Sequence, residues 1–172
     1  MDALPVCSPD QKWVYYLDGI SERIVRVPLD GSGKAEPLFD LPPKHFFSGQ
    51  LAIFPDGKTL VVPVQKPTEA VNIALFELGS SSPPRILDAG IYSPGACDLQ
   101  STHDGNSVAY IRQQNGVGNL WVNPLDGSAA YPITDFKSEG IGSFSFSPDG
   151  KKLAIVRGHT ESDVVLLQET KP

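Results

Sequence analysis

The chain has 172 residues, of which 40% are hydrophobic and 20% are charged, and this composition is typical of a globular domain. The formal net charge is −6 and the Lys and Arg residues form no cluster, so nucleic acid is not an expected partner. No apolar run approaches the roughly 20 residues of a membrane helix and no signal peptide is recognisable, so we expect no membrane segment in this chain.

One turn pattern divides the chain four times, at intervals of 45 to 48 residues. In its fourth copy, Ser147 and Pro148 precede the pair Asp149-Gly150. Pro presets a turn, the Asp side chain caps it, and Gly accepts the positive φ that the last position needs. We therefore assign structural roles to the repeated turn residues, which are Asp10, Asp56, Gly57, Asp104, Gly105, Asp149 and Gly150. The first copy has Gln11 in place of Gly, so its turn is expected to differ.

The strands of the first two repeats are predicted from short apolar runs around these turns. In the first repeat, residues 1–41, the predicted strands are residues 3–6, 14–17, 24–29 and 37–40. In the second repeat, residues 46–89, an inner strand precedes the turn, and the later strands are residues 60–64, 73–78 and 85–88. These runs are rich in β-branched or aromatic residues, which favour strands. Pro63 lacks the N–H of a ladder hydrogen bond, so we expect a bulge there.

The third and fourth repeats follow the same plan. The third, residues 92–136, has apolar runs at residues 108–111, 120–125 and 132–135. The fourth, residues 140–170, has runs at residues 141–146, 153–156 and 164–167 and no outer strand. Strict alternation in its first run places Ile141, Ser143 and Ser145 on one face and Gly142, Phe144 and Phe146 on the other. Small residues suit the innermost strand of a propeller, where neighbouring blades approach closely.

Each repeat thus holds four antiparallel strands in about 45 residues, which predicts an all-β fold made of β-propeller blades. No segment has helical periodicity. We treat residues 1–172 as a single propeller-type domain of four blades, the last of which lacks its outer strand. An open array of four blades leaves faces and strand edges uncovered. We therefore expect either further blades upstream of residue 1 or a second copy of the chain.

The segment from Phe146 to Ala154, with the sequence Phe-Ser-Pro-Asp-Gly-Lys-Lys-Leu-Ala, resembles the repeat of TolB-type, WD-repeat-like bacterial propellers. The resemblance covers nearly the whole chain, from residue 3 to residue 169. It implies a propeller of the kind found in periplasmic assembly factors, in sensor domains of bacterial kinases and regulators, and in the substrate-gating domains of prolyl-oligopeptidase-like peptidases. It also favours a periplasmic or extracytoplasmic location over a cytoplasmic one.

The residue types that carry chemistry show no catalytic pattern. His45, His103 and His159 fall in different repeats, so we expect no metal site. Cys7 and Cys97 match no metal or redox spacing and are interpreted as small core residues, with no disulfide indicated. The stretch from Gly116 to Gly118 lacks the third Gly and the helix of a dinucleotide loop and predicts a hairpin. The Gly-x-Ser-x-Gly motif of hydrolases is missing, so we predict no enzyme and no cofactor.

A binding face is expected where the loops after the outer strands and the loops between the two middle strands emerge together, because loops on a rigid scaffold carry function. The predicted ligand or partner face is polar and mixed in charge and consists of Lys44, His45, Tyr92, Arg112, Asn115, Lys137, Arg157, His159 and Glu161. Ordinary solvated loops would have the same composition. The aromatic residues of the strands are expected to pack between blades and are Trp13, Tyr16, Tyr110, Trp121, Phe144 and Phe146.

The leading hypothesis is a non-catalytic protein-interaction or sensor propeller of a larger bacterial protein, with a protein or peptide as its partner. The alternative is the substrate-gating propeller of a prolyl-oligopeptidase-like peptidase whose catalytic domain is absent here. A kinase or DNA-binding domain in the parent reading frame would support the first hypothesis, and a hydrolase domain would support the second. A stand-alone lyase or hydrolase is a third hypothesis, and it predicts turnover that depends on His45 or His159.

Overall fold

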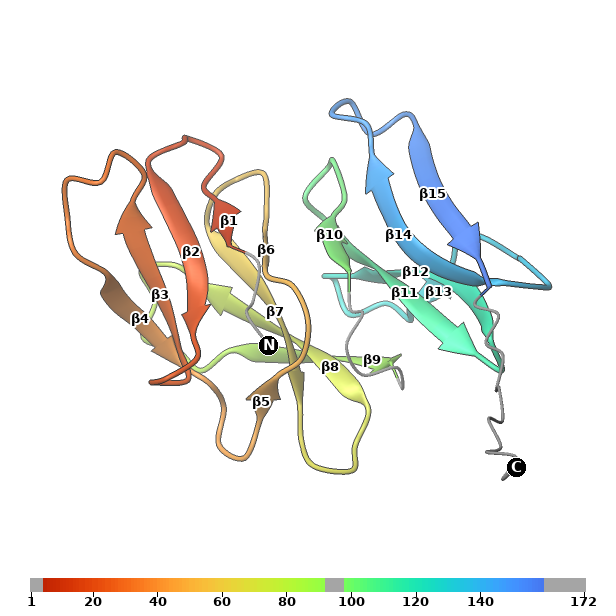
Figure 1. Cartoon of the computed structure of the whole chain (residues 1–172), viewed down its shortest axis with the longest axis horizontal. Coiled ribbons are helices and arrows are strands. Elements are labelled where there is room, and N and C mark those ends of the chain that lie inside the picture. Colours follow the sequence, from red (N-terminus) through yellow and green to blue (C-terminus); the bar gives the residue numbers. More distant parts are fainter. Residues whose placement is uncertain (1–4, 92–97, 160–172) are drawn as a thin grey trace, which may run out of the picture.

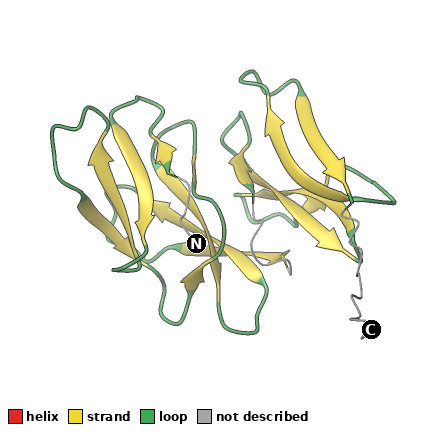
Figure 2. Ribbon diagram, in the orientation of Figure 1, coloured by secondary structure: helices red, strands yellow, loops and turns green. Residues whose placement is uncertain are grey.

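The computed structural model describes residues 5–91 and 98–159 of the chain, and these residues form fifteen strands and no helix. The strands belong to four antiparallel sheets that stand side by side, as the blades of a propeller do (Figure 1). Figure 2 shows that strands and their connecting loops account for all of the described chain. The all-β fold expected from the repeats is therefore confirmed.

The first and third blades have four strands in simple sequence order. The first blade consists of β1 (Val6–Cys7), β2 (Trp13–Asp18), β3 (Arg23–Pro28) and β4 (Glu36–Asp40). The third consists of β10 (Leu99–Ser101), β11 (Ser107–Gln114), β12 (Val117–Pro124) and β13 (Tyr131–Pro132). In both blades the inner strand comes just before the turn motif, as the repeats predict.

The second blade has an interrupted inner strand. Two short segments, β5 (Phe46–Phe47) and β6 (Ala52–Ile53), both pair with β7 (Thr59–Gln65), which is followed by β8 (Val71–Glu77) and β9 (Arg85–Ile91). The expected bulge at Pro63 is not in β7, because β7 pairs with β8 in continuous register. The irregularity lies opposite Pro63 instead: Phe47 faces Val64 and Ala52 faces Val61, so the inner chain loops out where Pro63 offers no N–H.

The fourth blade contributes β14 (Gly140–Phe146) and β15 (Leu153–Gly158), and the predicted strand at residues 164–167 lies outside the described residues. The expected alternation along β14 is wrong at its start. A β-bulge between Ile141 and Ser143 shifts the register against β15, so that Ile141 and Phe144 enter the same core, with 2% and 5% of their surface exposed. The extra residue of this bulge is Gly142.

The four turn motifs have one geometry and lie at the upper end of the blades in Figure 1. In each, the backbone N–H of the last residue donates to the carbonyl three positions earlier, at 2.8–2.9 Å. Gly57, Gly105 and Gly150 have φ of 67–68°. The expectation of a different first turn is wrong, because Gln11 adopts a φ of 56° and makes the same hydrogen bond to Ser8.

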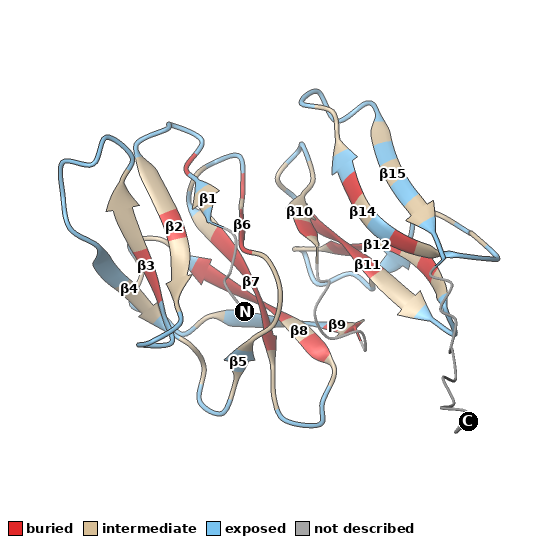
Figure 3. Ribbon diagram, viewed as in Figure 1, coloured by how far each residue is buried: buried red, intermediate tan, exposed pale blue. Residues whose placement is uncertain are grey.

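The core consists of three clusters, one between each pair of successive blades (Figure 3). Five of the six aromatic residues expected to pack between blades lie in or against these clusters, and Tyr16 is the exception. Polar side chains also cross the interfaces. Gln100 donates to the carbonyl of Phe144 and accepts from the N–H of Phe146, which joins the inner strands of the third and fourth blades.

The interpretation of both cysteines as core residues is wrong for Cys7, which is an exposed free thiol on β1. It pairs with Val14 on the side of the first blade that faces away from the second. Cys97 lies outside the described residues. Within the part of the chain that the structure describes, no helix is long and apolar enough to cross a membrane.

Candidate binding face

The turn aspartates have the capping role that the repeats predict. Asp104 accepts a hydrogen bond from the hydroxyl of Thr102 at 2.6 Å and from the backbone N–H of Asn106 at 3.1 Å. Asp149 makes the same pair of contacts with Ser147 and Lys151. Asp56 comes two residues after Phe54, which has no hydroxyl, and accepts from the N–H of Lys58 at 2.8 Å. The hydroxyl hydrogen bonds, followed by those from the backbone, lower the pKa of Asp104 and of Asp149.

Three of the predicted face residues line one pocket of about 400 Å³, which is formed by the third blade and the loop that follows it. Arg112 comes from β11, Asn115 from the hairpin after it, and Lys137 from the loop between β13 and β14. Sequence alone placed Arg112 in a loop, whereas β11 continues to Gln114. We call this the blade-3 pocket; its other lining residues are Gln114, Val117, Asn119, Trp121, Pro132, Thr134, Asp135 and Phe136.

A tight hairpin fixes one wall of the blade-3 pocket. Gln114 pairs with Val117, so Asn115 and Gly116 form a two-residue turn in which both have positive φ, 53° and 78°. Asn and Gly are the residues that favour this turn, because they tolerate the left-handed region. The hairpin interpretation of this stretch is confirmed, and the turn is tighter than a loose loop.

The opposite wall is the loop of residues 133–139, which Asn119 holds in place. The side-chain carbonyl of Asn119 accepts from the hydroxyl of Thr134 at 2.8 Å and from the N–H of Phe136 at 2.7 Å. Its amide donates to the carbonyl of Phe136 at 3.2 Å. Sequence reasoning missed Asn119, because an Asn inside a strand run gives no sign of which loop it will meet.

The floor of the blade-3 pocket combines a cation with an aromatic ring. The guanidinium carbon of Arg112 lies 4.8 Å from the centre of the Trp121 ring. Lys137 forms an ion pair with Asp135 at 2.5 Å, with both side chains largely exposed. Because the Asp135 charge offsets that of Lys137, Arg112 is the main positive charge of the pocket.

Two further predicted residues meet on the far side of the same loop. The guanidinium of Arg157 lies 3.7 Å above the ring of Phe136, donates to the carbonyl of Ser138 and forms an ion pair with Glu139 at 3.5 Å. His159 lies 3.8 Å from the other carboxylate oxygen of Glu139. Phe136 therefore separates Arg157 from the blade-3 pocket and belongs to both sites. It was not among the predicted residues.

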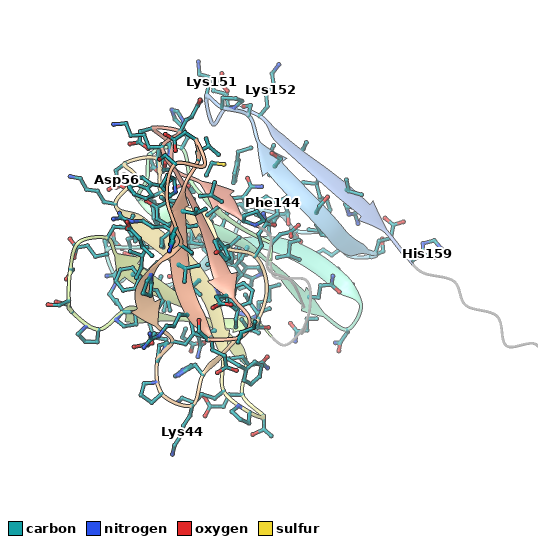
Figure 4. The ribbon with its side chains drawn as sticks, turned by 60° about the vertical axis from the view of Figure 1, so that its left-hand side comes forward. Lys44, Asp56, Phe144, Lys151, Lys152 and His159 are labelled. Atoms are coloured by element: carbon teal, nitrogen blue, oxygen red, sulfur yellow. The ribbon has the colours of Figure 1, made fainter. Side chains whose placement is uncertain are left out.

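The remaining predicted residues do not join this group. Lys44 and His45 lie in the loop between the first and second blades, and Figure 4 shows Lys44 at the bottom of the view, well apart from His159 on the right. The Nδ1 atom of His45 lies 3.1 Å from the carbonyl of Pro43. Tyr92 and Glu161 lie outside the described residues. Among the described residues there is no group of three His, Cys, Asp or Glu side chains that could hold a metal ion.

Comparisons with known proteins find the fold through structure alone, since no known protein family and no curated protein matches the chain by sequence. TolB from Acinetobacter baumannii matches with a TM-score of 0.69 and 19% identity, over 88% of this chain and 36% of its own. An oligogalacturonate lyase in complex with manganese matches with a TM-score of 0.69 and 16% identity, over 90% of this chain and 46% of its own.

A third match, a protein of a nidogen/laminin complex, has a TM-score of 0.65 and 14% identity over 89% of this chain and 55% of its own. The chain thus spans between about a third and about half of the length of these proteins. Together with the four-stranded blades and their repeated turns, these likenesses show that the chain has the fold of a TolB-type β-propeller.

Proposed function

We propose that the chain is a non-catalytic binding module that holds an acidic peptide segment of a protein partner in the blade-3 pocket. The observation that supports this most is the convergence of Arg112, Asn115 and Lys137 from three separate segments onto one pocket of about 400 Å³. This volume lies within the range of about 300–1,000 Å³ that is typical of ligand pockets. A location outside the cytoplasm is part of the same proposal and rests on the resemblance to TolB-type propellers.

Charge and shape favour a carboxylate as the recognised group. The planar guanidinium of Arg112 can donate two parallel hydrogen bonds to a carboxylate, and its stacking on Trp121 restricts its orientation. Among the described residues Arg112 has no ion-pair partner. The side-chain amides of Gln114 and Asn115 at the rim can bond the peptide backbone.

The non-catalytic part of the proposal is supported by the structural contacts of the residues that could carry chemistry. The turn aspartates cap their own turns. His159 is next to Glu139, and the ring of His103 packs against the turn of the fourth blade at Gly150. Each of these groups thus has a role within the fold.

The test is selection of a phage-displayed random peptide library on the immobilised chain. We expect enriched peptides to share an Asp or Glu. Arg112→Gln should weaken their binding at least about tenfold, because a hydrogen bond to a charged group contributes about 1.5–3 kcal/mol. Arg23→Gln is the matched control, since Arg23 forms an exposed ion pair with Asp40 on the first blade. Enriched peptides that share no Asp or Glu would contradict the proposal. So would peptides that bind equally well to Arg112→Gln and to Arg23→Gln.

A further inference from the structure

Neighbouring blades pack through the same strand positions each time. On the first middle strand of each blade (β2, β7, β11 and β15), alternate residues point toward the next blade and toward the preceding one, and we call these the forward and backward faces. The forward residues lie five and seven positions after the turn Asp, and the backward residues lie four and six positions after it. The repeat therefore predicts where any adjoining blade would make contact.

At all three interfaces within the chain, these positions other than Pro63 lie in or against a core cluster. The residues that meet are Tyr15 with Leu60 and Val62, then Val61 with Val108 and Tyr110, and then Ala109 and Ile111 with Leu153 and Ile155. Forward and backward faces are thus complementary surfaces that bind one another three times in one molecule.

The same positions are uncovered at the two ends of the array. On the forward face of the fourth blade, Ala154 is exposed and Val156 is 62% exposed, although both lie at positions that are buried in the second and third blades. On the backward face of the first blade, Val14 and Tyr16 are partly exposed. None of these four residues belongs to a core cluster of the described chain.

The turn motifs also have contact positions that are occupied between blades and left uncovered at the two ends of the array. Between blades, each turn Gly faces the second motif residue of the preceding blade: a Cβ at Gly57 would lie 3.6 Å from Pro9, and one at Gly105 would lie 3.9 Å from Pro55. Pro148, the equivalent residue of the fourth blade, is exposed. At the other end, Gln11 occupies the position that would face such a Pro.

We propose that a second copy of this chain binds these two faces, so that the forward face of the fourth blade packs against the backward face of the first blade of its partner. Each chain offers one surface of each kind, so two copies related by a two-fold axis would satisfy both contacts and close a ring. Two arrays of four blades would form a ring of eight blades, and known propellers have about four to eight. This contact is independent of the blade-3 pocket.

The experiment is the mass of the 172-residue chain in solution, measured by light scattering after size exclusion over a range of concentrations. We expect twice the 18.5 kDa of one chain. Val156→Asp should weaken the dimer at least about a hundredfold, because it buries an unpaired carboxylate in the contact. Ile20→Asp is the matched control, since Ile20 is 97% exposed in the turn after β2 and lies on neither face. A monomer at all concentrations, or a dimer that Val156→Asp leaves intact, would overturn the proposal.

A charge pair tests the geometry of the contact. Val14 lies on the backward face. A chain that carries both Val14→Lys and Val156→Asp should form the dimer again, because each new carboxylate then meets the new ammonium group of the other copy. Circular dichroism of each variant checks the fold, and Ala154→Arg provides a second disruption on the same face should Val156→Asp prove unstable. Failure of Val14→Lys to restore any dimer would refute the head-to-tail arrangement.

Discussion

His103 of the third blade lies directly against Gly150 of the fourth, so closely that a Cβ added at Gly150 would come within 2.6 Å of the Cβ of His103. At the equivalent contact a Cβ at Gly57 would lie 3.6 Å from the Pro9 ring, which is an ordinary contact distance. The replacement of Pro by His in the third turn therefore brings the third and fourth blades closer at this point than the first and second.

This difference predicts unequal effects of one substitution at two equivalent positions. Gly150→Ala and Gly57→Ala both force a Cβ into a φ of about 67–68°, which costs about 1–2 kcal/mol. Gly150→Ala adds overpacking against His103, which costs a further ~1–3 kcal/mol. Urea unfolding should show Gly150→Ala as the more destabilised by at least about 1 kcal/mol. Equal losses would mean that the turn of the fourth blade moves away without penalty.

A second prediction concerns the one turn without glycine. Gln11 adopts the left-handed conformation at a position where the other three turns have Gly. Gln11→Gly removes a conformational penalty of about 1–2 kcal/mol and adds about 0.5–1 kcal/mol of chain entropy. We expect a net gain of up to about 1.5 kcal/mol in unfolding free energy. Gln11→Ala retains the Cβ and should show no such gain, and a loss with Gln11→Gly would show that the Gln side chain itself stabilises the turn.

The first turn also shows how far the sequence could predict this structure. The offsets of the apolar runs from each Asp were enough for the blades, because strand and turn preferences are local. The conformation of Gln11 was not predictable in this way, since neighbouring backbone hydrogen bonds override its preference. The bulge at Gly142 was missed for a similar reason: only the packing of Ile141 and Phe144 into one core requires it.

The grouping of the residues in the candidate binding face was partly predictable. Loop position alone grouped Arg112, Asn115 and Lys137 on one predicted face, and these three residues line one pocket. Phe136 and Asn119 were not found, because their roles depend on contacts between strands and a loop that are 15 residues apart or further. Lys44 and His45 lie in the loop before the second blade and do not line this pocket, since sequence gives the end of a blade on which a loop lies but not the distance between blades.

A third prediction uses the hydroxyl groups of the turn motifs. The hydroxyl of Thr102, followed by the N–H of Asn106, lowers the pKa of Asp104 below its ordinary value of 3.8. A carboxyl group whose pKa is lower in the folded state stabilises the fold above its unfolded pKa, and this contribution is lost as the pH falls through the folded pKa. Stability should therefore decrease below about pH 4.

Thr102→Ala removes the hydroxyl and leaves the carboxylate, so the pKa of Asp104 should rise toward its ordinary value, as measured by NMR titration of the carboxyl carbon. Asp104→Asn should make the loss of stability in acid less steep, because one of the titrating groups is gone. Ser80→Ala is a control, since the hydroxyl of Ser80 accepts from the N–H of Ser82 outside these turns. An unchanged Asp104 titration in Thr102→Ala would contradict the assigned cause.

The last prediction separates a structural role of Arg157 from a direct role in binding. Arg157 stacks on Phe136, donates to the carbonyl of Ser138 and pairs with Glu139, so it holds the loop that forms one wall of the blade-3 pocket. Lys keeps the charge but loses the planar stacking. We expect Arg157→Lys to lower the unfolding free energy by about 1–2 kcal/mol, the sum of a cation–π contact and one hydrogen bond.

Hydrogen exchange at the amides of residues 134–139 should become faster in Arg157→Lys, while exchange in β7 and β8 stays unchanged. A double-mutant cycle with Phe136→Leu should give a coupling of at least about 0.5 kcal/mol, because the two side chains are in direct contact. If Arg157→Lys weakened peptide binding without any change in exchange or stability, Arg157 would contact the ligand itself. Faster exchange together with weaker binding would instead show that Arg157 acts through Phe136, by fixing the wall against which the ligand packs.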